Sequence, residues 1–464
     1  ELPQGWTPTY HAPLVSEFTG SVALNYPIVT PPGAAGLQPN LGLAYSSANG
    51  NGMMGRLQAD ETGFGWNNTA LIDVTQALDA CQDNVCEALG GDIDGLPATY
   101  DPYNQYTLSF NGAGYELIHN NGKAANGQPG RYYAQGHAGL YVELCKTPFS
   151  TFCAREPIQT APVFNTQSDV FWRIKGPDDT TYRLGYTTES EQEILRPTDA
   201  TGVDNKALRW RVDKVIDRFD NVMTYEYVED IYTGWVHPEY FHAPASYLER
   251  ITYDAYTVEF THTPLPYAVY ERTGYAVSSH TRYLSLITVK TGAQQIRHYA
   301  LGFDFQRYGV DNDTDHPPQE ATLQFPYGYQ STWCAAYQHV LDFKTPGNPD
   351  DNVAYVPDKM PVLLSIHEGG SDGAVKAPNA PDATFRYVFL GTGQYDHPQA
   401  NAHVRTCFPY LKTVETLYGP AGDETPTTLY TWRDEASANP PAQPYGGDNG
   451  ASVLGRYANV VERE

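Results

Sequence analysis

The chain has 464 residues, more than one hydrophobic core accommodates, so we expect several packed units or an extended repetitive sheet. Its 54 acidic and 29 basic residues give a formal charge of −25, which disfavours binding to nucleic acid and anionic lipids. Every apolar run is shorter than the roughly 18 residues needed to cross a bilayer, so no membrane span is expected. The 36 tyrosines suit half-buried strand faces, and 41 glycines with 35 prolines indicate many turns.

Residues 1–70 show the pattern of an N-terminal β segment. Apolar and polar side chains alternate from Val22 to Tyr26 and again from Leu41 to Tyr45, which is typical of strands with one buried face. The intervening Pro31-Pro32-Gly33 is a turn signal.

Residues 71–163 show little alternation of apolar and polar side chains and contain four of the six cysteines. We therefore expect a loop-rich segment crosslinked by disulfides. The simplest connectivity joins neighbours along the chain, although spacing alone leaves other pairings open. The spacings lack the CxxC clusters typical of zinc sites. Disulfides imply an oxidising compartment, hence a secreted or cell-surface protein. The expected pairs are Cys81 with Cys86, Cys145 with Cys153, and Cys334 with Cys407.

Residues 164–464 read as a series of strand–turn–strand units, and helical periodicity is nearly absent from the whole chain. We therefore predict an all-β fold of consecutive antiparallel hairpins in a curved sheet, with negligible helix. The last residues resemble the start of a further strand, and we expect the array to continue in a longer protein. The predicted strand pairs are 209–216 with 222–228, 247–253 with 256–263, 283–290 with 295–305, 362–367 with 384–389, and 410–418 with 427–432.

The first of these hairpins resembles the repeat of the YD-repeat (RHS-type) family. That repeat reads Asp-x-x-Gly-Asn, then three residues, then Tyr-x-Tyr. Here the matching residues are Asp217, Asp220, Asn221, Tyr225 and Tyr227. Asp220 replaces the usual glycine, but aspartate adopts positive φ at modest cost, so we expect the hairpin to form.

The N-terminal part is similar to the SpvB-type region of bacterial toxin-complex B components, which belong to the same family. Short motifs carry this resemblance through their order, among them Tyr26-Pro27-Ile28, Gly36-Leu37, Gly63-Phe64-Gly65-Trp66, Phe171-Trp172 and Pro409-Tyr410-Leu411. In this family the hairpin array spirals into a hollow shell around a C-terminal toxic or signalling segment. The resemblance implies a bacterial, secreted or cell-surface scaffold. Its partners would be the remainder of the same polypeptide, a toxin or cargo domain, and other toxin-complex or surface subunits.

Two glycine-rich motifs resemble catalytic or cofactor-binding signatures but lack their structural context. Residues 50–55 match GxGxxG, yet no helix pattern follows to hold a pyrophosphate. Residues 369–373 match GxSxG around Ser371, yet Pro378 and Pro381 exclude the helix of a nucleophile elbow. We interpret both as turns and expect no catalytic residue and no organic cofactor.

Alternating acidic residues suggest weak candidates for calcium binding, the alternative being solvated acidic turns. The run from position 311 departs from an EF-hand, since His316 stands where that loop needs glycine. The candidate ligands are Asp92, Asp94, Asp311, Asp313 and Asp315.

The sequence therefore favours a structural shell segment that encloses or presents a cargo and is not an enzyme. One alternative is an extracellular adhesin or fibre subunit that binds glycans or neighbouring subunits. Another is a β-rich glycan hydrolase, although no pair of catalytic carboxylates stands out among the acidic residues.

Overall fold

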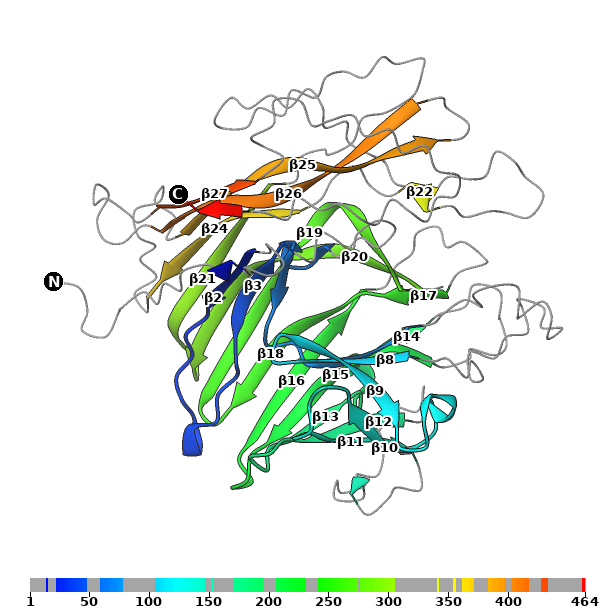
Figure 1. Ribbon diagram of the computed structural model, residues 1–464. Coiled ribbons are helices and arrows are strands. Elements are labelled where there is room, and N and C mark those ends of the chain that lie inside the picture. The colour runs from blue at the N-terminus through cyan, green and yellow to red at the C-terminus, as the bar shows by residue number, and fades with distance from the viewer. Residues whose placement is uncertain are drawn as a thin grey trace, which may run out of the picture.

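The computed structural model of the chain (Figure 1) consists almost wholly of β-strands and turns. Its three helices within the described residues are short 3-10 turns, η1 (Ala34–Gly36), η3 (Lys123–Ala125) and η5 (Thr188–Ser190). Within those residues no helix is long and apolar enough to cross a membrane. The structure describes residues 14–15, 22–47, 59–77, 105–146, 152–153, 170–194, 206–230, 241–273, 276–304, 340–341, 354–355, 361–370, 383–397, 402–416, 427–432 and 461–463.

The first strands form a four-stranded antiparallel sheet in the order β1-β2-β3-β6, called here the N-terminal sheet. In β2 the side chains of Val22 and Leu24 are buried and those of Ala23 and Asn25 are more exposed, as the alternating pattern predicted. A short hairpin of β4 and β5 precedes β6. The strands are β1 (Leu14–Val15), β2 (Val22–Pro27), β3 (Gly42–Ser46), β4 (Ala59–Asp60), β5 (Gly63–Phe64) and β6 (Trp66–Asn68).

Eight strands, β7 to β13 and β15, pair in succession and close into a ring because β15 returns to β7. Residues 71–163, expected to be loop-rich, contribute β7 to β11. The boundary expected after residue 163 falls between β11 and β12, which pair with each other. The strands are β7 (Asp73–Ala77), β8 (Gln105–Phe110), β9 (Ala113–His119), β10 (Gly130–Ala134), β11 (Tyr141–Lys146), β12 (Val170–Lys175), β13 (Thr181–Leu184) and β15 (Lys206–Ile216).

Aromatic side chains from four strands pack together in the ring: Tyr106, Tyr132, Trp172 and Trp210. The ring centroids of Tyr132 and Trp172 are 4.9 Å apart, and those of Tyr106 and Trp172 are 5.1 Å apart. Both pairs are T-shaped, the arrangement that aromatic quadrupoles favour. These large side chains supply the apolar burial that stabilises the closed ring of short strands.

The long strand β15 belongs to two structures at once. Its first half pairs with β7 and with β14 (Glu191–Ile194), and its second half pairs with β13 and β16. From β16 an antiparallel array continues through β18, β19, β20, β21, β24, β25, β26 and β27 to β28. The ring and the array are therefore continuous through one shared strand.

The array confirms the predicted all-β hairpin fold. One strand departs from consecutive pairing, because β17 (Phe241–Pro244) lies parallel to β20. The strands β22 (Val340–Leu341) and β23 (Ala354–Tyr355) form a separate pair. The array strands are β16 (Val222–Glu229), β18 (Ser246–Tyr253), β19 (Tyr256–Thr273), β20 (Ala276–Thr291), β21 (Gln294–Asp304), β24 (Val362–Gly369), β25 (Ala383–His397), β26 (Ala402–Thr416), β27 (Thr427–Trp432) and β28 (Val461–Arg463).

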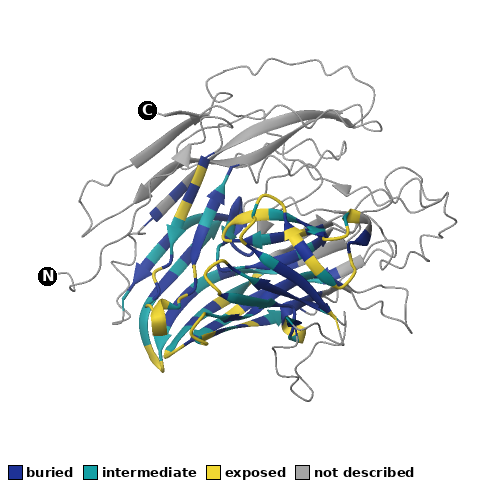
Figure 2. Cartoon of the chain, turned by 60° about the horizontal axis from the view of Figure 1, so that its bottom comes forward, coloured by how far each residue is buried: buried dark blue, intermediate teal, exposed yellow. Residues whose placement is uncertain are grey.

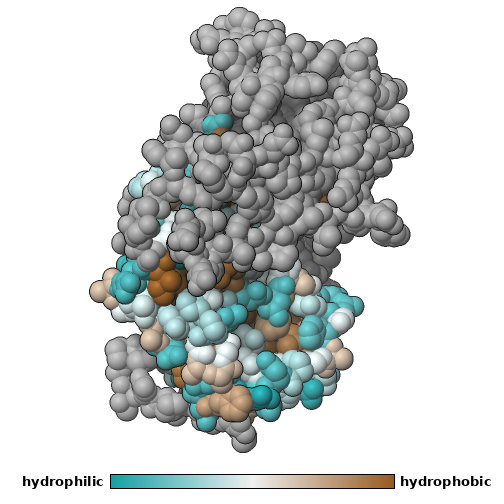
Figure 3. Space-filling model, turned by 90° about the vertical axis from the view of Figure 1, so that its left-hand side faces the viewer, coloured by the Kyte–Doolittle hydropathy of each residue, from teal (hydrophilic) through white to brown (hydrophobic). Residues whose placement is uncertain are grey.

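A single hydrophobic cluster runs through the N-terminal sheet, the ring and the array. Figure 2 shows buried residues alternating with less buried ones along the long strands, as expected for sheets with one covered face. On the face shown in Figure 3, apolar residues lie in small separate groups among hydrophilic ones. The main apolar burial is thus internal, in the cluster that the N-terminal sheet, the ring and the array share.

Candidate functional site

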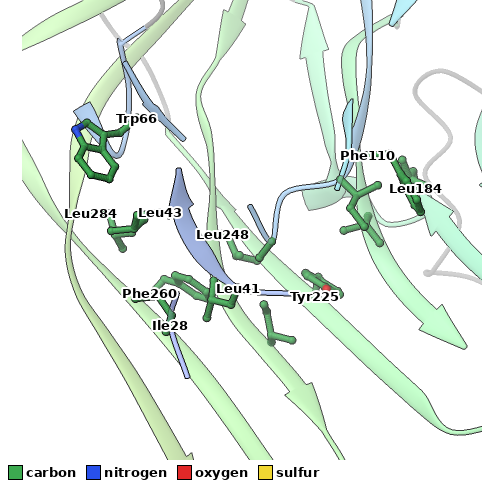
Figure 4. Packing of buried hydrophobic residues seen from close by; sticks show 14 of the residues in the cluster. Ile28, Leu41, Leu43, Trp66, Phe110, Leu184, Tyr225, Leu248, Phe260 and Leu284 are labelled. Atoms are coloured by element: carbon green, nitrogen blue, oxygen red, sulfur yellow. The ribbon is translucent and has the colours of Figure 1, made fainter. Parts of the chain in front are cut away.

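The N-terminal sheet lies against one side of the array, called here the covered face. Apolar side chains meet there: Ile28, Leu41 and Leu43 share a cluster with Phe260 and Leu284 (Figure 4). All five are at most 5% exposed. Burial of this kind is worth about 1.5–3 kcal/mol for each side chain, so apolar packing supplies most of the attraction.

Four hydrogen bonds of main-chain groups in the N-terminal segment help to fix its position on the covered face. These groups lie in turns and short strands of the segment and find partners in the array or next to it, as buried main-chain groups must. The bonds are Val29 N to Tyr299 OH (3.0 Å), Tyr253 OH to Pro31 O (2.9 Å), Phe64 N to Pro361 O (2.9 Å) and Leu284 N to Glu61 O (2.8 Å).

The Gly-Phe-Gly-Trp motif forms a tightly packed part of this contact. Gly63 has a φ of +93°, and a Cβ atom there would lie 3.0 Å from the carbonyl oxygen of Pro361, so the approach requires glycine. Phe64 and Trp66 are buried, and the Trp66 ring lies 4.8 Å from that of Phe385. The motif therefore anchors the N-terminal segment to the array.

A buried pair of a glutamate and a histidine lies beside this motif. Glu61 occupies the turn between β4 and β5, and its Oε2 is 3.0 Å from Nε2 of His262 on β19. The two side chains are 4% and 3% exposed. The His262 ring also packs on Tyr247, with centroids 5.1 Å apart.

The surroundings of Glu61 favour its charged form. Burial raises the pKa of the carboxyl, but the charge and hydrogen bond of His262 outweigh that effect. Arg211 and His280 act in the same direction, so the pKa lies below its ordinary value of 4.5. Glu61 is thus a carboxylate held by positive or protonatable groups from three strands, β15, β19 and β20.

A second polar cluster surrounds Asp230 at the end of β16. Tyr247 OH donates to its Oδ2 at 3.1 Å, Thr281 Oγ1 donates to the same oxygen, and Arg282 Nε lies 2.7 Å from Oδ1. Burial and the nearby Asp230 charge raise the pKa of the Tyr247 phenol, which stays a donor. The cluster ties β16 to β18 and β20 and is a structural crosslink.

The predicted YD-type turn forms as the resemblance implied. Asp220 has a φ of 64°, the positive value expected at the glycine position. Asp217 Oδ1 accepts hydrogen bonds from Phe219 N at 2.8 Å and Asn221 N at 2.9 Å, and Oδ2 accepts one from Asn221 Nδ2 at 2.7 Å. Burial opposes ionisation of Asp217, but the hydrogen bonds donated by Asn221 and Phe219 outweigh it and lower the pKa.

The two tyrosines of the motif point into the core. Tyr225 and Tyr227 are 5% and 4% exposed, and the Tyr227 hydroxyl donates to the carbonyl oxygen of Val212 at 2.7 Å. Burial raises the pKa of both phenols, so they remain neutral donors. Tyr227 thereby adds a side-chain hydrogen bond between β16 and β15, the two strands of the hairpin.

The same turn geometry occurs a second time between β12 and β13. Gly176 N donates to Thr180 O at 2.8 Å, and Asp179 has a φ of 67°. Asp178 Oδ1 accepts the Thr180 N–H at 3.1 Å. A three-residue loop whose last residue is left-handed is a standard hairpin connection, here closed twice by aspartate. The sequence motif predicted only the first copy.

The sulfur atoms of Cys145 and Cys153 are bonded, the pairing that their spacing predicted. Both cysteines are buried with Phe171 and Tyr186 in a cluster separate from the main core. Arg173 Nη1 donates to Phe152 O at 2.7 Å, and its guanidinium lies 4.8 Å from the Phe152 ring. The disulfide thus fixes residues 152–153 against β12.

The remaining predicted residues fall mostly outside the part of the chain that the structure describes. Cys407 lies in β26 opposite Gly391, without a described side chain. In the described ranges, no group of three or more His, Cys, Asp or Glu side chains is arranged to hold a metal ion. The undescribed positions are Cys81, Cys86, Asp92, Asp94, Asp311, Asp313, Asp315, Cys334, Ser371 and residues 50–55.

Sequence reasoning did not identify Glu61, His262, Arg211 or Asp230. Glu61 and His262 are 201 residues apart, and no local pattern brings them together. A usable signal was the position of Glu61 two residues before the Gly-Phe-Gly-Trp motif, since a charged residue beside a buried anchor needs a partner.

No family model matches the chain, and no curated protein matches it in sequence. Among solved structures it is similar to a chain of TcdB2-TccC3-TEV, with 11% identity and a TM-score of 0.47, over 96% of this chain and 22% of that one. It is also similar to a chain of TcdB2-TccC3-Cdc42, with 12% identity and a TM-score of 0.44, over 88% of this chain and 21% of that one. A third similar structure is the N-terminal domain of effector protein SpvB from Salmonella typhimurium strain LT2. Its identity is 13% and its TM-score 0.37, over 60% of this chain and 94% of that one. The chain spans about a fifth of the length of the toxin-complex chains that it matches.

Proposed function

We propose that the chain is a wall segment of a shell of the toxin-complex type and acts as a scaffold. The observation that carries the proposal is the continuous antiparallel array from β15 to β28, with the chain's own N-terminal sheet on one face. Strands in such an array pair with their neighbours, which leaves few open edges and gives a stiff, extended wall. The YD-type turn at Asp217 supports the same role.

The polar clusters fit a structural role better than a catalytic one. Glu61, His262 and Asp230 are each at most 6% exposed, and the first two face each other where the N-terminal segment meets the array. A substrate would have to displace that segment to reach them. Catalysis also needs a positioned nucleophile and an electrostatic stabiliser beside the base, and these clusters instead join strands.

The proposed partners are the remainder of the same polypeptide or a toxin or cargo domain, enclosed or presented by the wall, and other toxin-complex subunits. The proposed location is outside the bacterial cytoplasm. The buried Cys145–Cys153 bond supports that location, because disulfides persist mainly in oxidising compartments.

Cryo-electron microscopy of the full gene product tests the proposal. We expect a closed shell whose wall contains strands β15 to β27 and whose interior holds additional protein density. Limited trypsin digestion of the same sample should leave the enclosed density intact until the wall is denatured. A solid fibre, or an extended particle with no interior, would contradict the shell.

An adhesin role has one supporting observation on the outside of the ring. The Arg131 guanidinium lies 4.8 Å from the Tyr133 ring and 4.7 Å from the Tyr141 ring, and Tyr133 is 49% exposed. Exposed aromatic rings beside a fixed cation are a common form of binding surface. Glycan-array binding that Tyr133→Ala removes, with Tyr115→Ala as the control, would favour the adhesin.

A further inference from the structure

The attachment of the N-terminal sheet to the array includes one contact that acid can break. The contacts through Tyr299 and Tyr253 use phenol groups whose pKa values burial raises, so they do not change charge in acid. The Phe64–Pro361 bond joins two main-chain groups. The Glu61–His262 pair differs from these contacts, because it depends on an ionised carboxylate.

Charged and protonatable groups face Glu61 from each strand that packs on it. His262 comes from β19, His280 from β20 and Arg211 from β15. The Nε and Nη1 atoms of Arg211, and Oε1 of Glu61, are buried without hydrogen-bond partners among the described residues. The Glu61 carboxylate is therefore one counter-charge of the buried Arg211 guanidinium, the other being Asp73, which lies opposite Arg211 in the pairing of β7 with β15.

Acidification removes this contribution. At neutral pH the Glu61 charge faces Arg211, and the pair with His262 is intact. Protonation of Glu61 takes one buried negative charge away from Arg211, and a buried cation that loses a counter-charge is strongly destabilised. The N-terminal sheet is then held on the covered face by its apolar and main-chain contacts without the carboxylate.

We propose that Glu61 is an acid-sensitive latch, so that its protonation releases the N-terminal segment from the covered face while the ring and array stay folded. The latch concerns contacts within this chain and does not depend on the shell role. Its pH window follows from the lowered pKa of Glu61. The stabilisation is complete above the ordinary value of 4.5 and is lost as the pH falls through the lower, folded value.

Hydrogen–deuterium exchange of the full chain, from about pH 7 to about pH 3, tests the latch with exposure times corrected for the chemical exchange rate. We expect protection of residues 22–46 and 59–68 to fall by about tenfold for each pH unit between the ordinary pKa of 4.5 and the lower folded pKa of Glu61, and to level off below it. Strands β8 and β12 of the ring should keep their protection and serve as the internal reference. Loss of protection in both regions at the same pH would mean global acid unfolding and would overturn the latch.

Variants separate the latch from general instability. Glu61→Gln is neutral at every pH, so the N-terminal segment should already exchange quickly at neutral pH and show no further change in acid. His262→Gln should move release to a higher pH. Glu259→Gln is the matched control, because Glu259 lies on β19, the strand of His262, and pairs with Lys290 at a half-exposed site. A wild-type transition in Glu61→Gln, or an equal shift in Glu259→Gln, would overturn the proposal.

Discussion

Gly185 shows how one residue sets the packing of the ring. Its φ is +72°, and a Cβ atom there would lie 2.2 Å from Cδ1 of Trp210. The Trp210 side chain occupies this space because the adjacent residue has no side chain. A left-handed conformation and a close approach coincide at this position, and each independently requires glycine.

We therefore expect Gly185→Ala to lower the free energy of unfolding by about 3 kcal/mol, from overpacking added to left-handed strain. Urea denaturation followed by fluorescence measures the loss. Gly136→Ala is the matched control, since Gly136 has a φ of +83° with nothing near its missing Cβ. That variant should lose only about 1 kcal/mol, and equal losses would contradict the packing argument.

The Asp217 carboxylate supports a turn that its sequence motif made predictable. Asp217→Ala removes the acceptor for Phe219 N, Asn221 N and Asn221 Nδ2. We expect a loss of about 1–2 kcal/mol, because the site is partly solvated. Thermal unfolding checks this value. Asp220→Asn keeps a residue type that tolerates positive φ, so it should stay within about 0.5 kcal/mol of wild type.

At the scale of elements, the hairpins were predictable and the ring was not. The hairpin of β15 and β16 follows from alternating apolar residues on both sides of a recognisable turn. Ring closure needs β15 to pair with β7, which joins Arg209 to Thr75 across more than a hundred residues. The strands β8 to β11 lie in a segment whose weak alternation and four cysteines had predicted loops.

The disulfide between Cys145 and Cys153 closes a short loop beside β12. We expect replacement of both cysteines by alanine to lower the free energy of unfolding by about 2 kcal/mol, because a crosslink restricts the conformations open to the unfolded chain. Urea unfolding of this variant against wild type gives the value. An unchanged midpoint would show that Arg173 and Phe152 hold the loop without the bond.

The other predicted disulfides remain open to a direct test. Peptide mapping under non-reducing conditions should find Cys81 linked to Cys86 and Cys334 linked to Cys407. Free thiols or crossed pairings would contradict the prediction. In β26, Cys407 lies opposite Gly391, so a Cys334 linkage would attach a distant segment to the array.

At the scale of the molecule, the ring and the array should unfold together because β15 belongs to both. Amide exchange should give β15 the greatest protection in the chain, and peptides from β8 and β19 should report the same unfolding free energy. Two separated denaturation transitions, one for the ring and one for the array, would contradict this coupling.

The shared strand also determines at which end the array can be extended. Along its length β15 pairs on one side with β13 and β14, and on the other with β7 and β16. Both of its hydrogen-bonding edges are therefore occupied, and a further hairpin cannot be added there. Duplication of hairpins during evolution could therefore lengthen this sheet only at the end away from the ring. Arrays of different length would then all begin at the same ring.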